Sequence, residues 1–231
     1  ATSLADGVAP FPPRTVVLDA DSTLAGIEGI DWLAERRPAA VAVRIAELTS
    51  AAMAGTLPLD QVYAERLAAV APGRAELDAL GDAYVAAVAP GAVECVSALI
   101  GAGIRPLIVS GGLRPALLPL AAHLGIPASD VHGVELRFAA DGRYADYDRE
   151  SPLASQRGKA TLVAALLATG GLDRPLVAVG DGSTDLVIRT EGVADAFIAF
   201  TGFVARDAVV RGADFQCHTY EGLRALLLPS T

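Results

Sequence analysis

Four short runs of apolar, largely β-branched residues constrain the fold of this chain more than any other feature. They lie at residues 16–18, 107–109, 176–179 and 197–200. Each run is followed by polar or glycine residues, a pattern typical of parallel strands that are buried on both faces. Helical patterns separate the runs, at residues 92–102, 114–124 and 159–169. This alternation predicts an α/β fold in which helices flank a parallel sheet.

The segment between the first run and the second has a different pattern. It is rich in Ala, Leu, Glu and Arg at helical spacing, with breaks near Pro38, Pro58 and Pro72 and no strand pattern. Its place after the first strand predicts an inserted helical cap over the end of the sheet. The predicted domains are a cap of residues 24–88 and a core of residues 1–23 and 89–231.

Two smaller elements are predicted near the C-terminal half of the chain. Within residues 134–147, Asp141-Gly142 lies between Glu135-Leu136-Arg137-Phe138 and Arg143-Tyr144-Ala145, and this dipeptide is typical of a β-hairpin turn. Residues 223–228 have the pattern of a short closing helix.

Composition and charge exclude several classes of partner. The 231 residues carry a net charge of -9 without a basic stretch, which disfavours nucleic acid and anionic membrane surfaces. No apolar run reaches the roughly 20 residues that span a bilayer. The two Cys are far apart in the sequence, which fits a reducing compartment. We therefore expect a cytoplasmic protein with no nucleic-acid or membrane partner.

Acidic residues follow two of the predicted strands. Asp19 and Asp21 follow the first run, and Asp181 and Asp185 follow the third. Because parallel strands end at one edge of a sheet, we expect the four carboxylates to converge there. Their mutual repulsion requires a cation, and their hard oxygens suit Mg²⁺. Each segment alone also fits ordinary turn or helix-cap chemistry, but the two together favour a metal site.

Two further features suit an anion at the same edge. Ser110-Gly111-Gly112 precedes a predicted helix, where a hydroxyl and glycine amides can form an anion pocket, although Ser-Gly-Gly is also a common loop sequence. Lys159 is the only Lys among 18 basic residues, and it opens a helix, where the helix dipole disfavours a cation. A residue that breaks a local rule is a functional candidate, and the alternative is an ordinary surface lysine.

These motifs resemble those of the haloacid dehalogenase-like superfamily in kind, order and spacing. The matching segments are Asp19-Ala20-Asp21-Ser22-Thr23, Ser110-Gly111-Gly112, Lys159 and Gly180-Asp181-Gly182-Ser183-Thr184-Asp185. Glu28-Gly29-Ile30-Asp31 and Ala64-Glu65-Arg66-Leu67 narrow the resemblance to the phosphoserine phosphatase family. The resemblance runs from about residue 16 to the C-terminus. It implies a Rossmann-like core with an inserted helical-bundle cap.

The resemblance also implies roles for the core residues. Asp19 would be the nucleophile and Asp21 the general acid and base. Mg²⁺ would be held by Asp19, Asp181 and the backbone carbonyl of Asp21, with Asp185 supporting the metal and Lys159. The phosphoryl oxygens would be bound by Ser110, Gly111, Lys159 and Thr184.

In the cap, the resemblance assigns the substrate's amino-acid groups to two residues. Glu28 would face the ammonium and Arg66 the carboxylate, with Met53 lining the cap. Each has a structural alternative: Glu28 as a helix cap, Arg66 as a surface charge and Met53 as part of the cap core.

The activity implied by the resemblance is Mg²⁺-dependent hydrolysis of O-phosphoserine, the last step of serine synthesis, through an aspartyl-phosphate intermediate. Two alternatives share the fold: a phosphatase for another small phosphomonoester, and a phosphotransferase that passes the phosphoryl group to an alcohol. A third alternative is a catalytically inactive binding module, against which the intact motif set argues. The protein is expected to be a monomer or a homodimer.

Three features depart from the family pattern. Gly26-Ile27 stands where relatives often carry polar side chains, and two extra residues lie between Asp31 and Thr49. Thr201-Gly202-Phe203-Val204 stands where a Gly-Gly-Asn pattern is expected. These positions lie in or near the cap and the mouth of the site, so they bear on substrate preference and leave the core motifs unchanged.

Overall fold

The structure, a computed structural model, describes residues 12–228 and is built on a six-stranded sheet. All its strand pairs are parallel, in the order β3-β2-β1-β6-β7-β8. The strands are β1 (Thr15–Leu18), β2 (Arg105–Leu113), β3 (Val131–Val134), β6 (Leu176–Gly180), β7 (Ala196–Phe200) and β8 (Phe215–Cys217). Every residue of β1, β6 and β7 is buried, as the apolar runs predicted.

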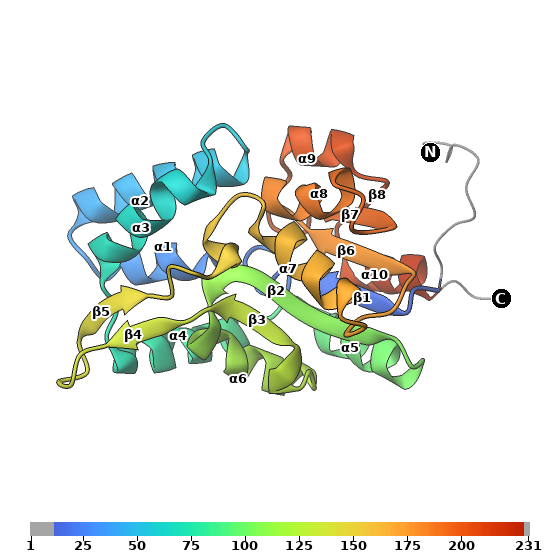
Figure 1. The fold of residues 1–231 in the computed structure, drawn as a ribbon, viewed down its shortest axis with the longest axis horizontal. Helices are drawn as coiled ribbons and strands as arrows, with labels where there is room; N and C mark the ends of the chain where they lie inside the picture. The colour runs from blue at the N-terminus through green and yellow to red at the C-terminus, as the bar shows by residue number, and fades with distance from the viewer. Residues whose placement is uncertain (1–11, 229–231) are drawn as a thin grey trace.

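Two groups of helices flank the sheet (Figure 1). In one group α5 packs against α6 and α10, and in the other α8 packs against α7 and α9. Their bounds are α5 (Ala92–Gly101), α6 (Arg114–Leu124), α7 (Gly158–Ala168), α8 (Ser183–Thr190), α9 (Asp207–Gly212) and α10 (Tyr220–Leu227). The predicted α/β fold is therefore confirmed. Helix α10 begins earlier than expected because the Thr219 side chain caps it, accepting a hydrogen bond from the Gly222 amide.

The segment after β1 folds entirely as helices and turns. Its helices are α1 (Gly29–Ala34), α2 (Ala39–Met53), α3 (Leu59–Val70) and α4 (Arg74–Ala86). Pro38 and Pro58 immediately precede α2 and α3, as expected for residues with a fixed φ and no amide hydrogen. Within residues 24–88, the only β-type pairing is the pair of isolated bridges made by Ala25.

Helix α4 packs mainly against the core, although it also contacts α1. Helices α1, α2 and α3 pack together, whereas α4 lies beside α6 (Figure 1). Gly81 permits this approach, because a Cβ at this position would lie 2.8 Å from Cγ of Pro119 in α6. The position of α4 is therefore set by the core as well as by the inserted segment.

A small hairpin extends from the sheet toward these helices. It pairs β4 (Leu136–Phe138) with β5 (Tyr144–Tyr147) in antiparallel fashion, as predicted. Gly142 in its turn has a φ of 82°, a left-handed conformation that glycine adopts without steric cost. Short 3₁₀ helices at Ala128–Asp130 and Pro152–Ala154 complete the connections.

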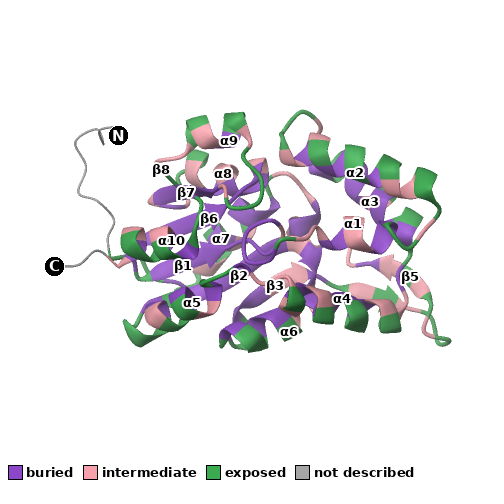
Figure 2. Cartoon of the chain, turned by 180° about the vertical axis from the view of Figure 1, so that it is seen from behind, coloured by how far each residue is buried: buried purple, intermediate pink, exposed green. Residues whose placement is uncertain are grey.

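Buried residues concentrate in the sheet and on the inward helix faces, and exposed residues lie on the outer helix faces (Figure 2). One continuous apolar core includes residues of both the sheet and the inserted helices. None of the helices formed by residues 12–228 has the length and hydrophobicity that crossing a membrane requires.

Candidate active site

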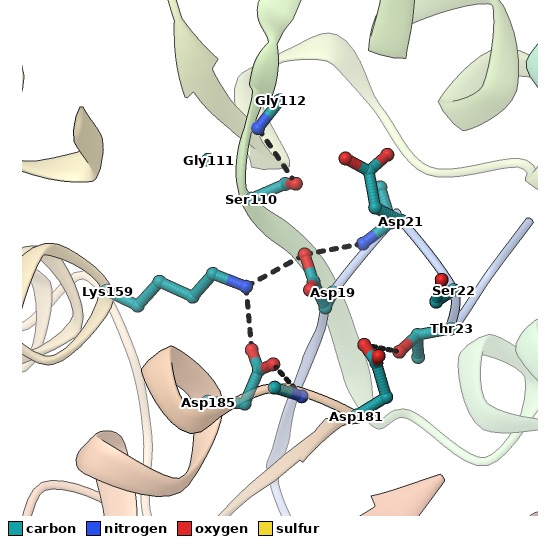
Figure 3. Close-up of polar contacts among 12 residues, drawn as sticks. Asp19, Asp21, Ser22, Thr23, Ser110, Gly111, Gly112, Lys159, Asp181 and Asp185 are labelled. Atoms are coloured by element: carbon teal, nitrogen blue, oxygen red, sulfur yellow. Dashed lines mark hydrogen bonds and ion pairs between the residues drawn. The ribbon is translucent and has the colours of Figure 1, made fainter. Parts of the chain in front are cut away.

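Three of the predicted acidic residues converge at the carboxyl edge of the sheet. Asp19 and Asp181 directly follow the neighbouring strands β1 and β6, and Asp185 lies in the first turn of α8. One carboxylate oxygen of each lies within 4.8 Å of the others, and all three residues are buried. The expectation that four carboxylates meet was wrong for Asp21, whose side chain points away from this cluster (Figure 3).

The Ser110 motif lies within a strand and not after it, contrary to expectation. Strand β2 continues through Leu113, and α6 begins directly afterwards at Arg114. The pairing of β2 with β3 is interrupted between Val109 and Leu113, which frees the intervening backbone from a regular ladder. The Ser110 hydroxyl accepts a hydrogen bond from the Gly112 amide at 3.1 Å. The hydroxyl and the glycine backbone thus remain together at the edge of the sheet.

Lys159 bridges two of the clustered carboxylates and is not a surface lysine. Its Nζ lies 2.8 Å from Oδ1 of Asp19 and 2.7 Å from Oδ1 of Asp185, and its side chain is 5% exposed. Burial acts to lower the pKa of Lys159, but the Asp185 and Asp19 carboxylates outweigh burial and raise it. The ammonium therefore stays charged and can bind an anion that approaches Asp19.

Asp21 occupies an environment that favours its protonated form. Burial raises the pKa of Asp21 well above its usual value, and the nearby carboxylates of Glu28 and Asp19 raise it further. The Tyr84 hydroxyl donates a hydrogen bond to Oδ1 of Asp21 and partly offsets this rise. A carboxyl group whose surroundings favour its protonated form is suited to act as a general acid.

One cavity connects the core motifs with the inserted helices. Of the eleven residues that the sequence singles out, all except Asp185 line it, and Asp185 lies behind Lys159. The lining residues are Asp19, Asp21, Glu28, Ile30, Met53, Leu59, Tyr63, Arg66, Ser110, Gly111, Gly112, Leu153, Ser155, Lys159, Asp181 and Thr184.

The two charged residues of the inserted segment are buried at this cavity. Arg66 on α3 is 4% exposed, so it is not a surface charge. Its Nη2 lies 3.6 Å from Oδ1 of Asp31, and its Nε has no hydrogen-bond partner among residues 12–228. Glu28 precedes α1 without capping it through its side chain, and its Oε1 accepts a hydrogen bond from the Ser22 hydroxyl at 2.7 Å. A buried guanidinium with a free donor is suited to bind a carboxylate.

Sequence reasoning missed Arg206, which precedes α9. Its Nη1 contacts Oδ2 of Asp181, and its Nη2 lies 3.9 Å from Oε1 of Glu28. Arg206 thus links the acidic cluster to Glu28, the residue expected to face a substrate ammonium. No local sequence signal separates Arg206 from the sixteen other Arg residues.

Two departures from the family pattern lie against each other. A Cβ at Gly26 would lie 2.6 Å from Cε1 of Phe203, so the aromatic ring occupies the space that a side chain at residue 26 would need. Phe203 is 42% exposed, and Arg206 in the same loop reaches Glu28. The two substitutions therefore form one local change beside the cavity.

Comparisons with known proteins agree on one family. The haloacid dehalogenase-like hydrolase family matches residues 16–188. The chain is 36% identical over 210 residues to a protein of Arabidopsis thaliana named chloroplastic phosphoserine phosphatase, covering 91% of this chain and 70% of the relative. It is 35% identical over 199 residues to the human phosphoserine phosphatase, covering 86% of each.

A comparison of solved structures identifies a similar protein. A crystal structure of a phosphoserine phosphohydrolase-like protein from Francisella tularensis superimposes with a TM-score of 0.85 at 26% identity. The superposition covers 93% of this chain and 100% of that protein. The similarity therefore extends over the core and the inserted helices together.

Proposed function

Because the chain belongs to the phosphoserine phosphatase family of haloacid dehalogenase-like hydrolases, we propose that it hydrolyses O-phosphoserine to serine and phosphate. One observation carries this proposal: a single cavity joins groups for a phosphoryl ester to groups for an amino acid. Asp19 and Lys159 suit the phosphoryl group, while Glu28 and Arg66 suit an ammonium and a carboxylate.

The reaction proceeds in two steps that share the same two carboxyl groups. A carboxylate oxygen of Asp19 attacks phosphorus and forms an aspartyl phosphate, while the bond to the serine oxygen breaks. Asp21 gives its proton to that departing oxygen. Water then attacks the phosphorus of the aspartyl phosphate, the bond between phosphorus and the Asp19 oxygen breaks, and phosphate is released. Asp21 takes up the proton that this water loses. The second step restores both Asp19 and the protonated Asp21.

The remaining residues of the core hold the phosphoryl group during both steps. The Ser110 hydroxyl, the Gly111 amide, the Lys159 ammonium and the Thr184 hydroxyl bind its oxygens. Lys159 is held by Asp185 as well as by Asp19, which fixes its charge at the reacting centre.

The acidic cluster fits a divalent metal ion, and we propose that this ion is Mg²⁺. Carboxylate oxygens of Asp19, Asp181 and Asp185 converge, and oxygen ligands of this type suit a hard cation. Asp19, Asp181 and the carbonyl of Asp21 would hold the ion, with Asp185 supporting it. When bound, the ion would balance the negative charge of the phosphoryl oxygens.

A second function, hydrolysis or transfer of another small phosphomonoester, is favoured by the contact between Gly26 and Phe203. The Phe203 ring fills the space beside Gly26, two residues before Glu28, where relatives often carry polar side chains. An apolar group there would admit substrates without an ammonium, and an alcohol acceptor would turn hydrolysis into transfer. A substrate panel with L-phosphoserine, D-phosphoserine and phosphothreonine distinguishes these outcomes.

We propose that the enzyme serves serine biosynthesis in the cytoplasm, as a monomer or homodimer. We also propose that residues 24–88 act as a cap which excludes bulk water while the ester is intact. The core beneath it would be residues 1–23 and 89–231, of which residues 1–11 and 229–231 lie outside the described part of the chain. In this cap Met53 would form part of the apolar wall.

Replacing Arg66 with alanine is expected to impair phosphoserine hydrolysis selectively. The substrate carboxylate would lose its partner in a buried site, at a cost of about 2–4 kcal/mol, mainly as a higher KM. Glu28→Gln should impair ammonium binding in the same way. An aryl phosphate has neither group, so p-nitrophenyl phosphate hydrolysis should barely change. The measurement is kcat/KM for both substrates in the parent and in each variant.

The exposed cap residue Arg44 provides the matched control, because its side chain is 59% exposed and pairs only with Glu65 in this structure. Arg44→Ala should leave both substrates unaffected. Equal losses on both substrates in Arg66→Ala would mean that Arg66 holds the cap together. No loss on either would make another phosphomonoester the preferred substrate.

Mg²⁺ is expected to stabilise the folded protein through the acidic cluster. A ligand at 100 times its Kd adds about 2.7 kcal/mol, which corresponds to a Tm increase of several degrees. Asp181→Asn should abolish most of this increase, whereas Asp78→Asn, an exposed substitution on α4, should preserve it. Thermal unfolding with EDTA and with increasing Mg²⁺ tests this. An equal increase in Asp181→Asn and the parent would place the metal elsewhere.

A further inference from the structure

The Tyr84 side chain reaches the proposed general acid from a helix outside the sequence motifs. Tyr84 lies near the C-terminal end of α4 and is fully buried. Its hydroxyl donates a hydrogen bond to Oδ1 of Asp21. The hydroxyl of a neutral phenol carries one proton, and this hydrogen bond uses it.

A glycine in another segment makes room for the Tyr84 hydroxyl. A Cβ at Gly29, the first residue of α1, would overlap this hydroxyl. Gly29 does not have a positive φ, so its backbone does not require glycine. The close approach of the hydroxyl supplies the reason for glycine at this position.

Packing of α4 against the core fixes the position of Tyr84. One turn before Tyr84, Gly81 lies against Pro119 of α6, where a side chain would not fit. The hydroxyl is therefore positioned by packing between α4 and the core. A group held by packing in this way can orient a neighbouring carboxyl group more strictly than a group on a loop.

We propose that Tyr84 is a positioning residue that engages Oδ1 of Asp21 and thereby turns Oδ2 toward the leaving oxygen of the substrate. The proton that passes to the serine oxygen is carried by Oδ2, as the ester bond breaks and the Asp19–phosphorus bond forms. This role rests on the proposed function, in which Asp21 is the general acid.

The role can be separated from a purely structural one through the leaving group. Serine departs as an alcohol and needs the proton, whereas p-nitrophenolate departs without one. The constant kcat/KM covers the steps up to release of this first product, so hydrolysis of the aspartyl phosphate does not enter it. Misorientation of Asp21 should therefore lower kcat/KM for phosphoserine and spare p-nitrophenyl phosphate.

The test compares Tyr84→Phe with the parent on both substrates. We expect kcat/KM for phosphoserine to fall about 10-fold to 100-fold, and that for p-nitrophenyl phosphate to change less than about threefold. Tyr220→Phe is the matched control, because Tyr220 is also buried and its hydroxyl donates to the Thr23 carbonyl at 3.0 Å. In this control, the ratio of kcat/KM for phosphoserine to kcat/KM for p-nitrophenyl phosphate should stay at the parent value.

A second variant keeps Tyr84 but displaces its hydroxyl from Asp21. Gly29→Ala should push the hydroxyl away from Asp21 and reproduce the selective loss, which covers the case that Tyr84→Phe does not fold. A parent protein that cleaves only p-nitrophenyl phosphate would overturn the proposed function and this inference with it. A parent active on both substrates, with folded variants that lose both equally or neither, would overturn the inference alone.

Discussion

Asp19→Asn is expected to lower kcat for phosphoserine by at least about 10³-fold while the protein stays folded. The amide has nearly the shape of the carboxylate, but it is neither a nucleophile at phosphorus nor a good ligand for a hard cation. Asp19 is buried at the end of β1, and its Oδ1 contacts Lys159. Phosphate release by the purified variant, together with its thermal unfolding, measures both parts of this prediction.

Two controls make the Asp19→Asn result interpretable. Deamidation of the new asparagine would regenerate the parent enzyme, so the variant's mass must be verified after the assay. Asp78→Asn removes a carboxylate from an exposed position on α4 and should leave kcat at the parent value. Residual turnover above one hundredth of the parent rate, with deamidation excluded, would refute the assignment of Asp19 as nucleophile.

Lys159→Ala should lower kcat/KM for phosphoserine by roughly 10²-fold or more, because a desolvated positive charge at the phosphoryl group is lost. Lys159→Arg should restore only part of this loss. A planar guanidinium is wider than an ammonium and cannot take the place of Nζ between Asp19 and Asp185, at 2.8 and 2.7 Å. The measurement is kcat/KM for phosphoserine in both variants and in the parent.

The stability of these variants must be measured alongside the rates. Removing the ammonium leaves Asp19 and Asp185 facing each other in a buried site, which is expected to cost about 3–5 kcal/mol of stability. Mg²⁺ should recover part of this loss by binding the same carboxylates. Full activity in Lys159→Arg would show that any cation suffices and that the single lysine carries no special role.

The buried strands could be predicted from sequence, whereas the edge strands could not. Strands β1, β6 and β7 are flanked by neighbours on both sides and covered on both faces, so their residues are almost all apolar. The edge strands β3 and β8 are short and include polar residues such as His132 and Gln216. Pairing on one side only places little constraint on sequence, so these strands have no distinctive pattern.

The site residues that directly follow strand ends could be predicted to lie together. The convergence of Asp19 with Asp181 requires only that β1 and β6 are adjacent in a parallel sheet. Arg206 and Tyr84 reach the site from α9 and α4, and their positions depend on how those helices pack. Asp21 points away from the cluster and binds Tyr84, a contact between residues 63 positions apart that no local pattern reveals.

The identity of the phosphorylated residue tests the central claim most directly. The parent protein is mixed with L-phosphoserine, quenched in acid during turnover and digested, and the peptides are examined by mass spectrometry. The account predicts a phosphoryl group on Asp19, with no such adduct in Asp19→Asn. Beryllium fluoride with Mg²⁺ should give a stable adduct at the same side chain. A phosphoryl group or beryllium fluoride adduct on any other residue would contradict the account.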